Sequence, residues 1–419
     1  MRLLSIPADK YEDYRLDVIF DGYKWDPQYL DNNTIAKHAL VITRQEHEEL
    51  AALAQKLDKE TTGAELMLYQ NKELAKPLKL PQNICNQLWK TSNYEPGNHI
   101  RLMRYDFHPT LEGKWALSEV NSDVPGGLAE ASLMPKIVAE LFGSDSGGKT
   151  GGNSYSFVDF SEIFTKAVSK KVKAEGTIAF IHCTSYSDDR QVMQFLGDRL
   201  TGVGFKAIYA AADHLRFEDN EAVSILAGSE GKIDAIIRFT PLEWLIKMKP
   251  RRSKSWHGFF RTVTPSCNHP VAMLAQTKRF PLVWDALIDI DSSLSMSTWR
   301  EFLPETLEVG DIKGRADRDD FIFKPVYGRV GENISIKEAC IDDEYKKIIK
   351  DVKLHKRKYL AQKRFNSMPL LSDEGQQYHV CIGAYCVEGM FAGFYARAGE
   401  KPRIDSSAAD IPVLIDDSL

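Results

Sequence analysis

Apolar and polar positions alternate most clearly between residues 100 and 121, in the segment IRLMRYDFHPTLEGKWALSEVN. The pattern predicts two β-strands, 100–107 and 115–121, because side chains alternate between the faces of a strand and both runs are rich in β-branched, aromatic and aliphatic residues. Residues 109–113 begin with a proline and end with a glycine, which predicts the turn between them. The segment is therefore expected to form a β-hairpin.

One face of this hairpin is expected to carry the polar groups. Arg104 and Asp106 share a face of the first strand, and Glu119 and Asn121 share a face of the second. The opposite face is expected to carry Met103, Tyr105, Phe107, Ala116, Ser118 and Val120. Two carboxylates and an amide suit a hard divalent cation, and the arginine suits a phosphate. An exposed ribbon with ordinary surface charges explains the hairpin equally well when it is taken alone.

Helical periodicity and short apolar runs predict the elements elsewhere. Residues 43–57 predict an amphipathic helix with an acidic first turn, which suits the helix dipole, and residues 128–142 predict another helix. Residues 176–209 predict a strand, a helix and a second strand, and the segment IDAIIRFT adds a third strand. This is the pattern of a small Rossmann-like α/β unit. Residues 255–419 mix strands and helices.

The segment FIFKPVYGRVGENISI, residues 321–336, predicts a strand, a turn and a second strand. Lys324 ends the first strand, where its ammonium group is able to hold a phosphate, and Gly328 and Gly331 let backbone N–H groups approach phosphate oxygens. Arg329 lies on the same loop, where it would meet developing negative charge. Taken alone, a plain glycine turn between antiparallel strands is the commoner meaning of such a pattern.

Composition limits the class of protein. With 419 residues, the chain is long enough for two or three subdomains with a substantial core. Its net charge of −5 implies no surface for polyanions, and the basic run at 247–254 lacks interleaved aromatic residues, which favours a solvated loop over a nucleic-acid site. The six cysteines form no C-x-x-C pair, and the amino terminus shows no apolar signal core. We expect a reduced, cytoplasmic protein that neither binds nucleic acid nor spans a membrane.

Residues 143–150, GSDSGGKT, match the phosphate-loop pattern G-x-x-x-x-G-K-[ST]. That loop requires a strand before it and a helix after it. Here a helix is expected before it, and Gly151, Gly152 and Asn153 follow it, which nucleate a helix poorly. A flexible linker is therefore favoured over a nucleotide site.

Together, the hairpin and the lysine–glycine segment resemble the ATP-grasp ligases, in which an E-x-N motif holds magnesium and a K-P-x-x-G-R-x-G loop closes over the nucleotide. The hairpin precedes the loop here, as in a circularly permuted member. The chain is most similar to the glutathionylspermidine synthetase family, over nearly its whole length. The motifs that carry this resemblance are GYKWDPQYL, RYDF, LSEVNSDVPGGLAEAS, RFTPLEWL, QTKRFPLVWD, FKPVYGRVGENISI, YLAQKRF and GAYCVEGMFAGFYAR.

The resemblance implies an α/β (α+β) fold, with a permuted ATP-grasp-like architecture and a small Rossmann-like, pre-ATP-grasp module. The expected divisions are residues 1–175 with helices and the metal-binding hairpin, 176–254 with the Rossmann-like module, and 255–419 with the nucleotide-binding region.

By the same resemblance, ATP and Mg²⁺ are the expected cofactors. Magnesium would be held by Asp106, Glu119 and Asn121. The nucleotide would be held by Lys278, Lys324, Gly328, Gly331, Gln362 and Lys363, the last two lying on the strand that reads adenine. The catalytic residues would be Arg104 at the terminal phosphate or the reacting carboxylate, Arg329 at the acyl-phosphate transition state and Arg397 at the acid substrate. Without the resemblance, Lys278 would be a solvated lysine at a helix end and Arg397 an ordinary arginine at a strand end.

The implied activity is the ATP-dependent joining of a small-molecule acid, such as a peptide, to an amine, such as a polyamine, through an acyl phosphate. Val124 and Gly126 stand where glutathione-binding members tend to carry small hydroxyl residues, which argues against glutathione. Glu332 places a negative charge in the glycine loop, where it contacts a metal or an amine or else weakens nucleotide binding. Two alternatives stay open: an ATP-grasp ligase that joins another acid to an amino acid or peptide, and a nucleotide-binding protein that has lost catalysis.

Overall fold

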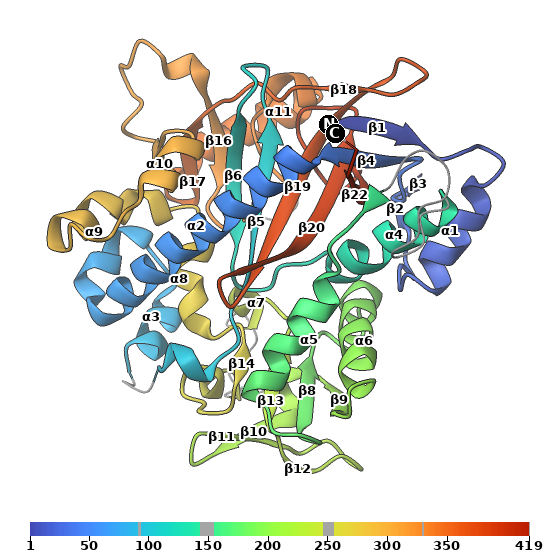
Figure 1. The fold of residues 1–419 in the computed structure, drawn as a ribbon. Helices are drawn as coiled ribbons and strands as arrows, with labels where there is room; N and C mark the ends of the chain where they lie inside the picture. Colours follow the sequence, from blue (N-terminus) through green and yellow to red (C-terminus); the bar gives the residue numbers. More distant parts are fainter. Residues whose placement is uncertain (91–93, 143–154, 246–254, 329–330, 419) are drawn as a thin grey trace.

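The computed structural model describes residues 1–90, 94–142, 155–245, 255–328 and 331–418. At its centre lies an antiparallel sheet in which β19 pairs with both β5 and β20. The strands of this sheet are β5 (Leu102–Pro109), β6 (Trp115–Asn121), β18 (Leu370–Leu371), β19 (Gln377–Val387), β20 (Met390–Gly399) and β21 (Ala409–Ile411). The expected hairpin is confirmed as β5 and β6, and the sheet joins it to the carboxy-terminal strands (Figure 1).

Three of the longer helices pack on the central sheet. Helix α2 (Arg44–Gln70) crosses β5, β19 and β20, and a capping box of Thr43 and Glu46 fixes its first turn (Figure 1). It confirms the helix expected from residue 43 and extends it to Gln70, because Ala64 and Leu68 continue the buried stripe. Helix α4 (Leu128–Leu141) is the second expected helix, and α5 (Phe160–Lys171) packs beside it on β20.

The expected Rossmann-like unit is confirmed. Its parallel strands run in the order β14-β13-β8-β9, and α6 (Ser187–Thr201) forms the crossover between β8 and β9. The strands are β8 (Thr177–Ile181), β9 (Lys206–Ala210), β13 (Ala235–Arg238) and β14 (Ser266–Cys267). β14 thus belongs to this sheet although it follows residue 254, where the module was expected to end. That expected end lies within 246–254, outside the described residues. The proposed divisions of the chain stay predictions.

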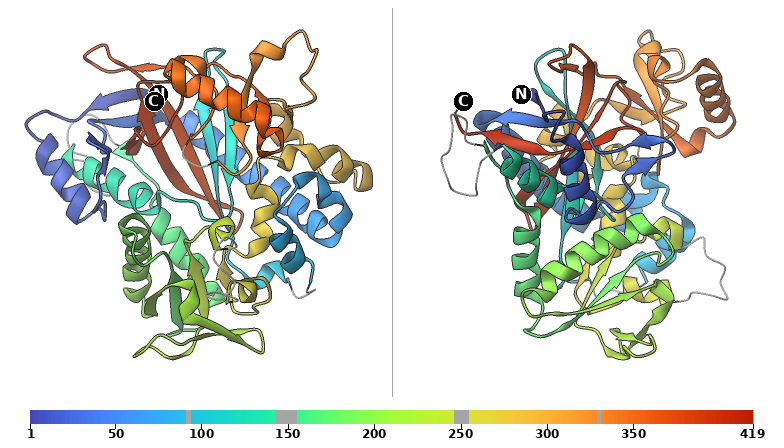
Figure 2. Two further views of the ribbon diagram at one scale, coloured as in Figure 1. Left: turned by 180° about the vertical axis from the view of Figure 1, so that it is seen from behind. Right: turned by 90° about the vertical axis from the view of Figure 1, so that its right-hand side faces the viewer.

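A second small sheet, in the order β15-β17-β16, carries the lysine–glycine segment. Its antiparallel strands are β15 (Thr306–Glu308), β16 (Phe321–Pro325) and β17 (Tyr359–Lys363). The second strand expected after the glycine loop is wrong, because residues 331–336 form turns and irregular structure and β16 pairs instead with β17. In the views of Figure 2 this sheet and the Rossmann-like unit lie at opposite ends of the molecule.

The two ends of the chain meet in a further sheet, ordered β1-β4-β22-β7 (Figure 1). Its strands are β1 (Arg2–Ser5), β4 (His38–Thr43), β7 (Tyr155–Ser156) and β22 (Val413–Asp416). The remaining strands are β2 (Gln28–Tyr29), β3 (Asn32–Asn33), β10 (Leu215–Glu218), β11 (Glu221–Ser224) and β12 (Gly231–Lys232). The remaining α-helices in the described ranges are α1 (Tyr11–Phe20), α3 (Gln82–Leu88), α7 (Leu242–Leu245), α8 (Met273–Gln276), α9 (Trp284–Ile290), α10 (Ser297–Phe302) and α11 (Asp342–Leu354). Within those ranges, no helix has both the length and the apolar character that crossing a membrane requires.

Buried His99 joins the central hairpin to the Rossmann-like sheet. Its Nδ1 accepts the backbone N–H of Ser266 at 3.3 Å, and burial, aided by Lys171, lowers the pKa of His99 to about 4. The unfolded chain, with a histidine pKa near 6.5, therefore takes up a proton first as the pH falls. We expect the free energy of unfolding to decrease by about 3 kcal/mol from this group between pH 6.5 and 4. Urea denaturation across this pH range measures the effect. The variant His99→Gln should show a weaker pH dependence of the free energy of unfolding, and the same dependence as in the wild type would contradict the role given to His99.

Candidate active site

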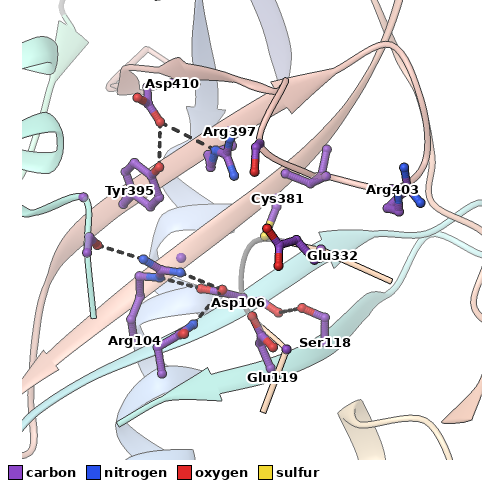
Figure 3. Close-up of a pocket in the computed structure, with 18 of the residues that line it drawn as sticks. Arg104, Asp106, Ser118, Glu119, Glu332, Cys381, Tyr395, Arg397, Arg403 and Asp410 are labelled. Atoms are coloured by element: carbon purple, nitrogen blue, oxygen red, sulfur yellow. Dashed lines mark hydrogen bonds and ion pairs between the residues drawn. The ribbon is translucent and has the colours of Figure 1, made fainter. Parts of the chain in front are cut away.

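A cavity of about 610 Å³ brings together segments that lie far apart in the sequence (Figure 3). Its walls come from the hairpin, the start of the glycine loop, the carboxy-terminal strands and the loop after α1. Nine residues expected to act together line it: Arg104, Asp106, Glu119, Asn121, Lys278, Lys324, Gly328, Gly331 and Arg397. The hairpin and the lysine of β16, two hundred residues apart, therefore face one space.

The register of the hairpin places its polar side chains as expected. Asp106 lies opposite Glu119, and Arg104 lies opposite Asn121. A β-bulge then sets Phe107 opposite Leu117, which leaves Ser118 as the extra residue. The expectation that Ser118 and Ala116 lie on the opposite face is wrong, because Ser118 lines the cavity and Ala116 pairs with cavity-lining His108. The inserted residue reverses the alternation beyond the bulge.

Arg104 and Asp106 form a buried, bidentate ion pair on β5. The guanidinium donates from Nε at 2.7 Å and from Nη2 at 2.9 Å to the two carboxylate oxygens, and its Nη1 donates to the carbonyl of Gly126 at 2.8 Å (Figure 3). Burial raises the pKa of Asp106, although Arg104 opposes this. A side chain at Gly383 would collide with both partners, so a glycine on β19 is needed for the pair to form. All the hydrogen bonds described for Arg104 therefore go to Asp106 and to the carbonyl of Gly126 in the cavity wall.

Two lysines converge on Glu119. Lys278 lies 2.7 Å from its Oε2 and also donates to the carbonyl of Gly328 at 2.7 Å. Buried Lys324 donates to the Ser118 carbonyl at 3.4 Å. Burial opposes the ionisation of Glu119, but Lys278 and Lys324 outweigh it, so the pKa of Glu119 lies below its ordinary value. Burial, helped by Lys278, lowers the pKa of Lys324 to about 8.

The glycine loop begins at the end of β16. Gly331 has a positive φ of 67°, and a Cβ there would collide with the carbonyl of Ile404, so this loop packs closely on the segment before β21. Glu332 lines the cavity and is exposed. Arg329 lies outside the described residues, so its expected catalytic role stays a prediction.

Two expected nucleotide-binding residues do not line this cavity. Gln362 lines a smaller cavity of about 30 Å³, which Glu119 and Lys278 also line, and its amide donates to Thr306 at 3.0 Å. Lys363 is exposed, and its ammonium lies 3.7 Å from Asp317. Arg364 and Phe365, which follow on the chain, line the main cavity instead. The adenine-binding role of β17 remains a prediction.

The other end of the cavity holds charged residues that sequence reasoning did not select. Lys24 lies 2.9 Å from Glu130 and 2.7 Å from Asp410, and Asp410 also accepts a hydrogen bond from Tyr395 at 2.6 Å. Arg397, which was expected from the sequence, lies 3.7 Å from Asp410 (Figure 3). It also donates to the carbonyls of residues 405 and 408. Lys24 lies in the motif GYKWDPQYL, so the family resemblance marked this segment in the sequence. The residues around it do not indicate which carboxylates pair with Lys24.

The family model described as "Glutathionylspermidine synthase preATP-grasp" matches residues 8–416 of this chain. The chain belongs to this family. The resemblance in the motifs is thereby confirmed, and this synthase family is one of ligases. No curated protein matches the sequence.

A solved structure supports the architecture of this synthase-family protein. The protein is similar to a glutathione synthetase-like effector (GSS30) from Globodera pallida, with a TM-score of 0.61, 11% identity and coverage of 96% of this chain and 97% of that one. A second similar structure is a putative gamma-glutamylcysteine synthetase from Methylobacillus flagellatus KT, with a TM-score of 0.44, 11% identity and coverage of 84% and 86%. The mixed α/β fold of ATP-grasp type, with the hairpin ahead of the lysine strand, is confirmed.

The donor types on the hairpin fit a magnesium ion that is shared with a nucleotide. Mg²⁺ is usually bound through one or two carboxylates together with substrate phosphates. Glu119, whose Oε2 is paired with Lys278, and the amide oxygen of Asn121 supply such donors at the cavity wall. Both oxygens of Asp106 are engaged by Arg104. In the described part of the chain, no three His, Cys, Asp or Glu residues are grouped to hold a metal by themselves. The fit is therefore to a shared site and not to a closed protein site.

Proposed function

We propose that this protein is an ATP-dependent carboxylate–amine ligase that forms an amide through an acyl phosphate. The observation that carries the proposal is the convergence of Glu119, Asn121, Lys278 and Lys324 in one cavity. Two lysine ammonium groups beside a carboxylate and an amide are complementary to a triphosphate with its magnesium ion. Membership of a synthase family supports the same reaction class.

The residues of this chain would act mainly by electrostatics and positioning. In the first step a substrate carboxylate oxygen attacks the γ-phosphorus, the bond from that phosphorus to the bridging oxygen breaks, and ADP departs. Lys278 and Lys324 would stabilise the charge on the phosphoryl oxygens. Glu119 and Asn121 would hold magnesium, which would supply further charge neutralisation.

In the second step the amine nitrogen attacks the acyl carbon, the bond to the phosphate oxygen breaks, and the proton lost by nitrogen passes to the departing phosphate. Arg397 would anchor the acid substrate, because it lines the same cavity from β20, which β19 separates from the hairpin. The glycine loop would exclude water, which otherwise hydrolyses the acyl phosphate. Its close packing on the segment around Ile404 supports that role.

The wall near residue 126 argues for an acid other than glutathione. Val124 and Gly126 line the cavity without a side-chain hydrogen-bond donor. The Gly126 carbonyl is occupied by Arg104 and by the hydroxyl of Tyr385. A substrate with polar groups at this wall would lose those hydrogen bonds. The alternative of a ligase for another acid, joined to an amino acid or peptide, is therefore favoured over glutathione.

Coupled measurement of ADP release over a panel of acids and amines tests the proposal, starting with glutathione plus spermidine. We expect ADP release that requires Mg²⁺, one acid and one amine together, and equal amounts of ADP and phosphate. Glutathione should be a poorer acid than apolar dipeptides. Tight ATP binding with no ADP release from any pair would instead support a nucleotide-binding protein that has lost catalysis.

A further inference from the structure

Lys24 is an internal cation at the end of the cavity opposite the phosphate-binding lysines. Only 13% of its side chain is exposed, and its ammonium group lies between Glu130 at 2.9 Å and Asp410 at 2.7 Å. Burial opposes protonation, but the two carboxylates outweigh it and raise the pKa of Lys24. Lys24 is therefore a fixed positive charge within the cavity.

The loop after α1 is shaped to place this lysine. A Cβ at Gly22 would collide with the Val18 carbonyl, and Tyr23 has a positive φ of 57°, which is costly for a residue with a side chain. Both neighbours of Lys24 are tied to α6: the Tyr23 hydroxyl donates to Asp198 at 2.6 Å, and the Trp25 N–H donates to Gln191 at 2.9 Å. Strained backbone that is fixed on both sides indicates that the position of Lys24 matters.

The carboxylates around Lys24 form a place suited to an ammonium group. Glu130 is 8% exposed, and its Oε2 has no hydrogen-bond partner among the described residues. Asp410 is 4% exposed and is shared between Lys24 and Arg397. A buried carboxylate requires a cation close by. Of the further acids at this end, Asp26 and Asp188 are exposed and would hold a cation only weakly. Asp189 is buried at the start of α6 and accepts the backbone N–H of Cys183 at 3.4 Å.

We propose that Lys24 determines which amine this ligase accepts, by filling the cation position between Glu130 and Asp410. The acceptor is then an amine with a single amino group. A diamine or polyamine carries a second ammonium group, and the buried carboxylates that would pair with it, Glu130 and Asp410, are already paired with Lys24. This inference rests on the proposed function for its choice of substrate. The occupancy of the carboxylate pair is tested separately from catalysis.

The binding test uses the variant Lys24→Ala and n-propylammonium, which replaces the deleted part of the side chain. Thermal melting of the full chain is followed with n-propylammonium and with uncharged 1-propanol. We expect the variant to melt at a lower temperature and to regain stability saturably with propylammonium but not with propanol. The wild type should gain less stability from propylammonium than the variant does. Lys166→Ala, which removes a 74% exposed lysine paired with Glu162, is the matched control and should show no response. An equal response of wild type and variant, or none in the variant, overturns the inference.

The kinetic test asks whether Lys24 controls selectivity and not stability alone. We expect Lys24→Ala to lower KM for 1,3-diaminopropane at least tenfold relative to propylamine, with kcat for propylamine changed less. A purely structural role of Lys24 would change KM for both amines by the same factor, and that outcome overturns the proposal. If Lys24→Ala does not fold, Lys24→Met is the second variant, because it preserves most of the side-chain volume. A further test needs no variant: spermidine should leave the melting temperature of the wild type unchanged. Should no pair of substrates release ADP, the ligase proposal fails while the melting test still decides the occupancy.

Discussion

Replacing Lys324 with methionine is expected to reduce kcat for ADP release at least 100-fold while leaving the fold intact. The substitution keeps most of the length of the side chain and removes the charge that would stabilise the transferring phosphoryl group. Single groups of this kind contribute about 100-fold to 1000-fold to the rate. Lys324 is 6% exposed, and its pKa of about 8 indicates that the surroundings do not stabilise its charge in the free protein. Loss of the charge should therefore preserve stability. Glu119→Ala, which removes the expected metal ligand, should reduce ADP release similarly.

The matched control is Lys358→Met, an exposed lysine immediately before β17 on the same small sheet. It should release ADP at the wild-type rate. Steady-state ADP release and thermal melting of the variants separate catalysis from folding. Undiminished turnover of Lys324→Met or Glu119→Ala would refute the assignment of this cavity as the ligase site.

The substitution Arg238→Leu is expected to lower the free energy of unfolding by about 3–5 kcal/mol, the usual cost of breaking a buried ion pair. Arg238 on β13 donates to Asp123 at 2.5 Å, and the two side chains are 1% and 0% exposed. The other oxygen of Asp123 accepts the N–H of Leu242 at 2.9 Å. This pair ties the end of the hairpin segment to the Rossmann-like sheet, so its loss leaves a buried carboxylate without its guanidinium.

Urea denaturation measures this effect, with Lys232→Met as the control. Lys232 forms a surface pair with Glu221 in which both side chains are about half exposed, and such pairs contribute about 0–1 kcal/mol. A loss of stability in Arg238→Leu no larger than in Lys232→Met would mean that the pair does not hold the two units together.

Local pattern was sufficient for much of the site. Alternation placed Arg104, Asp106, Glu119 and Asn121 on one face of a hairpin, and the observed register agrees. The same rule failed at Ser118, because a bulge has no reliable signature in a single sequence and reverses the alternation after it. The second strand expected beyond Gly331 also failed, since the pairing partner of β16 comes from β17, far along the chain.

The remaining parts of the site depend on contacts between distant segments. Nothing near residue 24 indicates that its ammonium group meets Glu130 and Asp410, which follow more than 100 and 380 positions later. Gly383 likewise looks like an ordinary strand glycine until Arg104 and Asp106 are seen to occupy the space of its missing side chain.

The sequence by itself determined the faces of the hairpin that carry the polar residues and the α/β class, because these follow from the periodicity of side chains along helices and strands. Only the tertiary structure decided that Lys24 fills the carboxylate pair, that Arg104 is committed to Asp106 and that Lys278 meets Glu119. Those pairings arise from packing between strands and loops far apart in the chain, and the free energy of a buried charge depends on which partner the fold places within about 3 Å of it.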